Sequence, residues 1–267
     1  MPELDGLEVL RKHIGLKEIM SLIERTAQWV SPETFRYLPV WYPEFSRRAC
    51  IYKSNWSEKQ LNKNGTTGDA TQKYEANINA SNALTLALGL KKRERPNWSC
   101  CHIWGIDDAS FQKSNRVVSD PHFYSCVANM VLLPTPLKAF TDTMPEVKAM
   151  LRICSKNLYG WQCDHPDLDA AGSEITNWTA WDAYPASWPT SKCERVPIGT
   201  VPFSPTIKAY ADRRLERIRK DLVSAGNYYP REQVRKVFAF WQKWMALSEP
   251  GHDGNGKCAS NCFRIAT

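Results

Sequence analysis

Two short apolar runs, joined by a long polar connection, constrain the fold of this chain more than any other feature. The first run ends in a histidine, Cys101-His102-Ile103-Trp104, and the second opens on an asparagine, Asn129-Met130-Val131-Leu132-Leu133. Thr135-Pro136 follows at once, and this pair is typical of a helix start. We therefore expect a strand, a polar connection, a paired strand and a helix, in that order, with the rest of the chain packed around them.

Composition and the N-terminal sequence bound the class of protein. The chain has 267 residues, of which 43% are apolar, and this is enough for a sizeable core. No segment approaches the ~18 consecutive apolar residues of a membrane span. The N-terminus, MPELDGLEVLRKH, is charged throughout and lacks the plan of a signal peptide. These features predict a cytoplasmic protein without membrane association.

Apolar spacing predicts six helices. The predicted helices cover residues 7–30, 74–88, 135–141, 144–159, 205–225 and 230–247. Residues 161–205 contain six prolines and four tryptophans without a sustained period, which predicts an irregular wrap. The expected fold is α+β and mainly helical. Its expected regions are an N-terminal part (1–90), a central strand and helix unit (91–160), the wrap (161–205), and basic helices with a flexible tail (206–267).

The central unit contains residue types that suit the hydrolysis of a phosphodiester. Such a reaction needs a base that activates water, a cation that stabilises the charge of the phosphate, and a group that orients the base. His102, at the end of the first predicted strand, is a candidate for the base. Asn129, at the start of the second, is a candidate for fixing the imidazole or its backbone. The competing interpretation is a structural histidine beside an asparagine that caps a turn.

On the residues Cys101-His102-Ile103-Trp104 and Asn129-Met130-Val131-Leu132-Leu133-Pro134, residues 98–160 resemble the HNH, or His-Me finger, endonucleases. The resemblance implies a ββα-metal fold for this unit, built into the larger α+β protein. It implies a single divalent cation such as Mg²⁺, with Mn²⁺ as a substitute, and double-stranded DNA as the substrate. It also implies that His102 is the general base and Asn129 the orienting residue. A free-standing nuclease of this size would suit restriction or defence.

The ligands of the implied metal ion differ from those that the family usually has. The residue before the histidine is usually acidic in the family, and here it is Cys101. The following helix usually supplies a histidine or asparagine, and the matching window here is Thr135-Pro136-Leu137-Lys138. The candidate replacement ligands lie in the polar connection: Asp107, Asp108, Asp120 and His122. Asp120 and His122 precede the second strand closely enough to fold back beside His102, whereas Asp107 and Asp108 also suit a solvated turn.

The net charge of +7 is concentrated near the C-terminus, which predicts an anionic partner. Residues 206–247 contain ten Lys or Arg and four Asp or Glu. A second basic run precedes the central unit. The residues predicted to contact nucleic acid are Lys91, Lys92, Arg93, Arg95, Arg213, Arg214, Arg217, Lys220 and Arg235. A solvated surface is the competing interpretation. A two-fold homodimer would suit a palindromic double-strand cut.

Two further classes of protein stay open. The first is a DNA-binding protein without catalysis, on an HNH-like scaffold that has lost its metal ligands. The second is an interaction protein stabilised by structural Zn²⁺. Its candidate ligands are Cys258 and Cys262, with Cys154, Cys163 and His165. Because no second half-site has suitable spacing among the nine cysteines, buried or tail thiols are the favoured interpretation of these residues.

Overall fold

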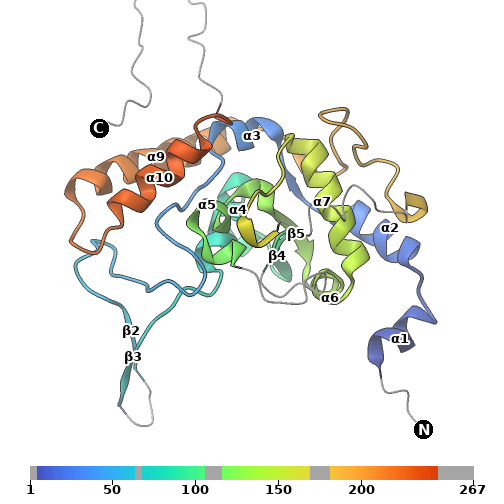
Figure 1. The fold of residues 1–267 in the computed structure, drawn as a ribbon, viewed down its shortest axis with the longest axis horizontal. Helices are drawn as coiled ribbons and strands as arrows, with labels where there is room; N and C mark the ends of the chain where they lie inside the picture. The colour runs from blue at the N-terminus through green and yellow to red at the C-terminus, as the bar shows by residue number, and fades with distance from the viewer. Residues whose placement is uncertain (1–4, 64–67, 106–115, 169–180, 246–267) are drawn as a thin grey trace, which may run out of the picture.

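The computed structural model describes residues 5–63, 68–105, 116–168 and 181–245 of the chain (Figure 1). Four residues named above lie outside the described residues: Asp107, Asp108, Cys258 and Cys262. The described chain mixes helix and strand, as expected for the α+β class, and helices predominate. None of the described helices combines the length and the apolar character that crossing a lipid bilayer requires.

Strands β4 (Trp98–His102) and β5 (Met130–Pro134) pair antiparallel at the centre of the molecule. Trp98 lies opposite Pro134, and His102 lies opposite Met130. Helix α6 (Thr135–Thr143) begins directly after β5 and is followed by α7 (Pro145–Tyr159). The prediction that the second strand opens on Asn129 is wrong by one residue. Asn129 ends a short 3-10 helix, η3 (Val127–Asn129), because its side chain binds the backbone beyond β4.

The first predicted helix is two helices, which corrects the expectation for residues 7–30. Helix α1 (Gly6–Arg11) starts at Asp5, whose carboxylate accepts the backbone N–H of Leu7 at 2.8 Å. Helix α2 (Leu16–Thr26) starts after Gly15, whose extended backbone (φ −79°, ψ 163°) interrupts the helical path. A continuous helix is thus broken by a glycine at an N-cap.

The other predicted helices are present with shifted ends. Helix α4 (Ile78–Ala87) starts four residues later than predicted, because the carboxylate of Glu75 accepts the backbone N–H groups of Ile78 and Asn79. Helices α9 (Pro205–Ser224) and α10 (Arg231–Trp241) correspond to the two predicted basic helices. The remaining short helices are α3 (Pro32–Tyr37), α5 (Pro121–Tyr124), η1 (Lys92–Glu94), η2 (Val117–Ser119), η4 (Pro166–Leu168) and η5 (Trp181–Ala183).

One hydrophobic core unites all four regions expected from the sequence. It extends from Ile19 on α2, through β5 and α7, to Trp241 on α10. Four tryptophans are fully buried in it: Trp29, Trp41, Trp188 and Trp241. Core packing therefore accounts for these four indoles, and none of them is exposed for stacking on a base.

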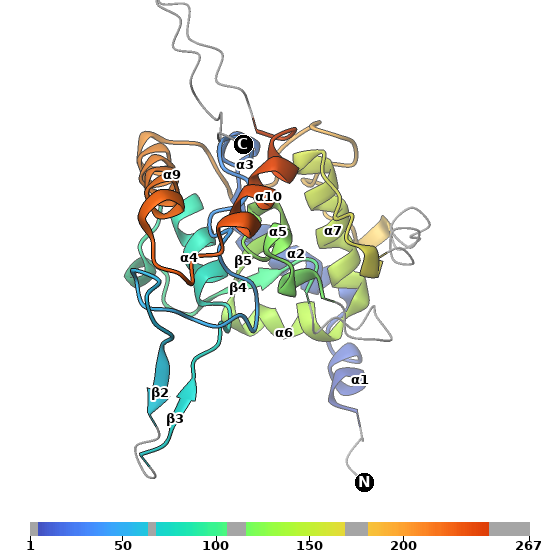
Figure 2. The ribbon, with the colours of Figure 1, turned by 60° about the vertical axis from the view of Figure 1, so that its left-hand side comes forward.

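Two further strand pairs flank the central one. Strand β1 (Trp29–Val30) pairs parallel with β6 (Thr200–Val201), and Gln28 bridges to Leu132 of β5. Strands β2 (Leu61–Lys63) and β3 (Ala70–Gln72) form an antiparallel hairpin that projects from the rest of the molecule (Figures 1 and 2). Helix α6 lies below the central strand pair in both views, whereas α9 and α10 lie in the upper part (Figures 1 and 2).

Candidate functional site around His102

The ring of His102 is fixed by a backbone carbonyl. Its Nε2 lies 2.8 Å from the carbonyl oxygen of Tyr124, on α5. A carbonyl oxygen only accepts hydrogen bonds, so Nε2 carries the proton and Nδ1 carries the lone pair. The residue is only 7% exposed, and its ring stacks near the ring of Tyr124 with centroids 5.9 Å apart. The structure therefore holds the imidazole in the one neutral tautomer whose Nδ1 can accept a proton.

The carbonyl that fixes His102 is itself held by a hydrogen-bonded chain. The hydroxyl of Tyr124 donates to Oε1 of Glu75 at 2.7 Å. Glu75 is buried and caps the N-terminus of α4, where Asn79 Nδ2 also donates to its Oε2 at 2.6 Å. The position of the His102 ring is thus tied to two helices beyond its own strand.

Asn129 holds the backbone segment that follows β4 through hydrogen bonds. Its side chain is fully buried, and its Oδ1 accepts the backbone N–H of Trp104 at 2.7 Å. Its Nδ2 donates to the carbonyl oxygens of Trp104 and Phe123, both at 3.2 Å. Its own carbonyl accepts the N–H of Ile103 at 2.9 Å. Asn129 therefore orients the chain directly after His102 through the backbone, and these hydrogen bonds do not reach the imidazole.

Three buried polar residues of α7 support the same region. They are spaced four and three residues apart, so they share one face of the helix. Lys148 Nζ donates to the carbonyl of His102 at 2.6 Å, and Ser155 Oγ donates to the carbonyl of Ala128 at 2.6 Å. The guanidinium of Arg152 lies 4.3 Å from the centre of the Trp104 ring. This face of α7 thus braces both ends of the connection between the two strands.

A cavity of about 200 Å³ opens beside His102. Its charged lining consists of Arg47, Lys138, Lys148 and Asp142, with Cys100, Cys101 and Gly105 also on its wall. Lys138 and Asp142 form an ion pair one turn apart on α6. The structure thus brings together a neutral imidazole, three cationic side chains and one carboxylate from four separate parts of the chain.

Burial favours the neutral forms of both His102 and Cys101 in this cavity. Burial lowers the pKa of His102 to about 4, although the Tyr124 carbonyl raises it, and the charges of Lys148 and Arg47 lower it further. Burial raises the pKa of the Cys101 thiol to about 11, and the charges of Lys148 and Lys138 oppose that rise. At neutral pH the imidazole is therefore uncharged and Cys101 is a thiol.

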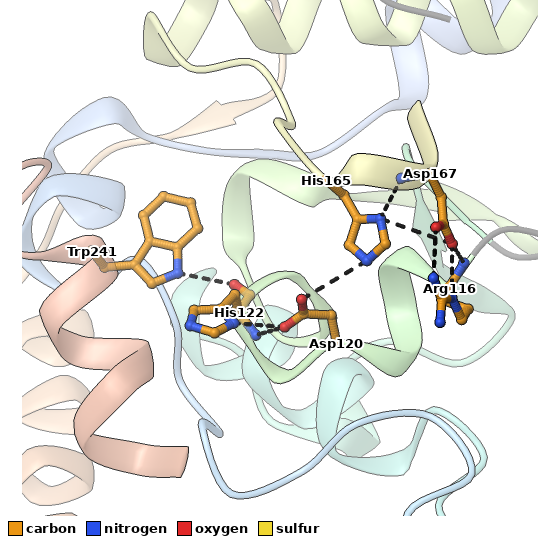
Figure 3. Close-up of polar contacts among 6 residues, drawn as sticks. All are labelled: Arg116, Asp120, His122, His165, Asp167 and Trp241. Carbon is orange, nitrogen blue, oxygen red and sulfur yellow. Dashed lines mark hydrogen bonds and ion pairs between the residues drawn. The ribbon is translucent and has the colours of Figure 1, made fainter. Parts of the chain in front are cut away.

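Asp120 and His122, two predicted metal ligands, lie at the start of α5 and contact each other. Asp120 Oδ1 accepts from His122 Nδ1 at 2.7 Å, and its Oδ2 lies 3.9 Å from Nε2 of His165 (Figure 3). The carbonyl of His122 accepts from the indole of Trp241 on α10 at 2.9 Å, and its ring packs edge-on against Phe240. His122 thus faces α10, whereas His102 is bonded to the residue at the other end of α5.

A metal ion needs several donor side chains that converge on one point. Within the described residues, no group of three or more His, Cys, Asp or Glu side chains could hold a metal ion. The zinc candidates Cys154, Cys163 and His165 therefore form no such group, and Cys154 and Cys163 are buried free thiols. In the cavity, a single described carboxylate is already paired with a lysine. These residues do not fit Mg²⁺, which prefers several oxygen ligands.

Arg95 and Arg214, two of the predicted nucleic-acid contacts, have little exposed side-chain surface and bind other parts of the fold. Arg95 is buried and donates through Nε to the hydroxyl of Thr85 at 2.7 Å. Arg214 donates to the carbonyl of Trp41 at 2.6 Å and pairs with buried Glu44. Both guanidinium groups therefore connect parts of the fold.

The other predicted basic contacts are exposed: Lys91, Lys92, Arg93, Arg213, Arg217, Lys220 and Arg235. Arg217 pairs with Asp221 on its own helix at 2.7 Å. Helices α9 and α10 lie in the upper part of Figure 1, away from α6, which lies below the central strand pair. The charge-rich helices therefore do not border the cavity, whose lining comes from β4, α6, α7 and the segments around Arg47, Asn77 and Val118.

Arg47, Asp142, Lys148 and Tyr124 belong to the site but are not among the residues predicted from the sequence. Lys138 and Asp142 had a usable signal, because an acidic and a basic residue four apart on a predicted helix share one face. Lys148 had a weaker one, as the first member of a polar stripe on a helix that is otherwise apolar on that side. Arg47 gives no signal of its own, since it reaches the cavity from an irregular segment 55 residues before His102.

Comparisons of the chain with protein-family models, with curated proteins and with solved structures gave no match. Function is therefore inferred from the geometry and chemistry of this chain alone.

Proposed function

We propose that this protein is an endonuclease that hydrolyses phosphodiester bonds of DNA, with His102 as the general base. The observation that carries the proposal is the hydrogen bond from His102 Nε2 to the Tyr124 carbonyl at 2.8 Å, beside a cavity lined by cations. This hydrogen bond fixes the imidazole with its lone pair on Nδ1. The positive charge of the cavity lining would attract a polyanion to the same place. The order β4, β5 and α6, with His102 and Asn129 at the strand ends, agrees with the resemblance to HNH endonucleases.

The proposed step uses water as the nucleophile. Nδ1 of His102 takes a proton from the water, and the water oxygen bonds to phosphorus. The bond from phosphorus to the leaving oxygen breaks, and that oxygen takes up a proton from solvent. Asn129 acts as a positioning residue, because its side chain binds the backbone of Trp104 rather than the reacting atoms.

The divalent ion implied by the family resemblance, Mg²⁺ or Mn²⁺, stays a prediction. Of the predicted ligands, Asp108 lies outside the described residues, and Asp120 and His122 contact one another at the start of α5. No step above depends on such an ion.

The test is the cleavage of supercoiled plasmid by the purified chain, with Mg²⁺, with Mn²⁺ and with EDTA in separate reactions. We expect nicked or linear product from the wild type. In His102→Ala the rate should fall by about 10²- to 10⁴-fold, which is the usual contribution of a general base. His13→Ala is the matched control, because His13 is exposed beyond the end of α1. Cleavage by His102→Ala at the wild-type rate would exclude this mechanism.

A second candidate function is DNA binding without hydrolysis. The observation that favours it is the pairing of Asp142 with Lys138, which leaves the described cavity without a free acidic group for a metal ion. It predicts DNA affinity that falls steeply with salt and no product with any divalent ion. Turnover that is lost in His102→Ala would reject it.

A further inference from the structure

The charges around the cavity suit an anion. Arg47, Lys138 and Lys148 contribute three positive charges, and Asp142 contributes one negative charge. His102, with a pKa of about 4, is neutral at pH 7, so the described lining has a formal charge of +2. A phosphodiester carries one negative charge and inorganic phosphate carries one to two, which the lining can neutralise.

Lys148 is the most informative of these cations, because its side chain is buried. Only 3% of the residue is exposed, and Nζ donates to the carbonyl of His102 at 2.6 Å. Burial of an ammonium group is costly unless hydrogen bonds and negative charge offset the lost hydration. A phosphate in the cavity would supply negative charge beside the residue that activates water.

Lys138 reaches the same cavity from α6. Its ion pair with Asp142 holds the ammonium group at the cavity wall, although 44% of its side chain is exposed. The charges of Lys138 and Lys148 both act on the thiol of Cys101, the residue before His102. The two ammonium groups therefore approach the end of β4 from two different helices.

We propose that this cavity is a phosphate site in which Lys138, Lys148 and Arg47 bind the anion directly and provide the positive charge that a divalent ion would otherwise supply. The inference rests on the proposed function for the nature of the substrate, a phosphodiester. The three cations keep their protons and stabilise the negative charge on phosphorus-bound oxygens, and water remains the only co-reactant. Phosphate binding is therefore independent of divalent ions.

Binding of inorganic phosphate to the full chain in the presence of EDTA tests this proposal. The readout is the NMR signal of the His102 ring protons, assigned by comparison with His102→Gln. We expect saturable shifts with the wild type and an unchanged apparent affinity when Mg²⁺ replaces EDTA. Shifts that appear only with Mg²⁺ would overturn the proposal.

Two substitutions on α6 separate an anion site from a metal site. Lys138→Gln should weaken phosphate binding about tenfold, because it removes a charge-assisted contact. Asp142→Asn should strengthen binding about threefold or more, because it removes the carboxylate that repels the anion. A metal site requires the opposite result for Asp142→Asn, since the carboxylate would be a ligand. The matched control is Lys236→Gln, which breaks an exposed ion pair of the same spacing on α10.

The outcomes distinguish this proposal from the proposed function. Phosphate binding in EDTA without DNA cleavage under any condition would leave the anion site intact and reject the nuclease. DNA cleavage that needs Mg²⁺ and is abolished in Asp142→Asn, without metal-free phosphate binding, would retain the nuclease and reject the anion site. Equal binding by wild type, Lys138→Gln and Arg47→Gln would also reject it. Circular dichroism of each variant shows whether the fold is retained.

Discussion

The two ends of the short helix α5 hold histidines in different surroundings. His102 meets the C-terminal end of α5, where its Nε2 donates to a neutral carbonyl in a buried position. His122 lies at the N-terminal end, where its Nδ1 is bonded to the carboxylate of Asp120 and its side chain is 26% exposed. The first arrangement fixes the tautomer of His102 and leaves the lone pair on Nδ1, where it can accept a proton. The second connects Asp120, α5 and α10, which is a structural arrangement. The kind of oxygen that a histidine binds thus distinguishes a candidate general base from a histidine that connects parts of the fold.

Removal of the Asn129 side chain should have the largest effect on the His102 end. Asn129→Ala leaves three buried backbone groups without their present partners, on Trp104 and Phe123. At about 1 kcal/mol for each group, the free energy of unfolding should fall by about 3 kcal/mol. DNA cleavage should be lost as well, since the backbone beside His102 is no longer oriented. Urea unfolding followed by circular dichroism measures the first effect.

Asn157→Ala is the matched control, because the side chain of Asn157 makes one hydrogen bond among the described residues, to the carbonyl of Pro189 at 3.0 Å. We expect a loss of about 1 kcal/mol there, with cleavage retained. If Asn129→Ala cost no more than Asn157→Ala, the buried hydrogen bonds of Asn129 would not be what orders this end of α5.

The sequence predicts the local half of this arrangement and misses the long-range half. The apolar runs and Thr135-Pro136 predict β4, β5 and α6, because strand and helix signals are local. The pairing of the two runs then places His102 and Asn129 near one another. In contrast, the His102 ring is fixed by a carbonyl 22 residues away. Every residue has a backbone carbonyl, so no residue type in the sequence indicates which carbonyl will bind His102.

The prediction of Asp120 and His122 as metal ligands beside His102 also used only local information. Their short distance from β5 along the chain suggested that both could fold back beside His102. The side chain of Asp120 instead caps α5 by accepting the N–H of His122 at 2.8 Å, which commits the carboxylate to the start of that helix. The positions of Arg47 and Lys148 depend on how α7 and the irregular segment before β2 pack, and this packing is not encoded at any single position.

The pH dependence of stability should separate the two ends of α5. The pKa of His102 is about 4 in the folded protein and about 6.5 in an unfolded chain. Between these values the unfolded state binds a proton that the folded state does not. Stability should therefore rise with pH from about 4 to 6.5, by about 3 kcal/mol at most, and then level off.

At the other end, the folded-state pKa of Asp120 is lowered. Burial raises it, but the hydrogen bonds from His122 outweigh that effect. The contribution of ionised Asp120 to the free energy of unfolding is therefore present above its unfolded pKa of about 3.8 and is lost as the pH falls below that value. Urea unfolding at a series of pH values should show that His102→Gln removes part of the rise above pH 4, whereas Asp120→Asn changes the slope of the profile only in the more acidic range. An identical profile for wild type and His102→Gln would show that the imidazole is not held neutral.

The smallest effect is expected from Asp120→Asn at neutral pH. The asparagine retains an oxygen that can cap α5, and it loses only the charge that faces His122 and His165 (Figure 3). Stability should fall by about 1 kcal/mol. DNA cleavage should stay within about threefold of the wild type, because the Tyr124 carbonyl and the His102 ring keep their positions. A loss of cleavage as large as that of His102→Ala would mean that Asp120 serves the reaction directly, as the metal ligand predicted from the sequence. The carboxylate end of α5 would then be part of the active site, and the contrast between its two histidines would no longer distinguish a general base from a structural histidine.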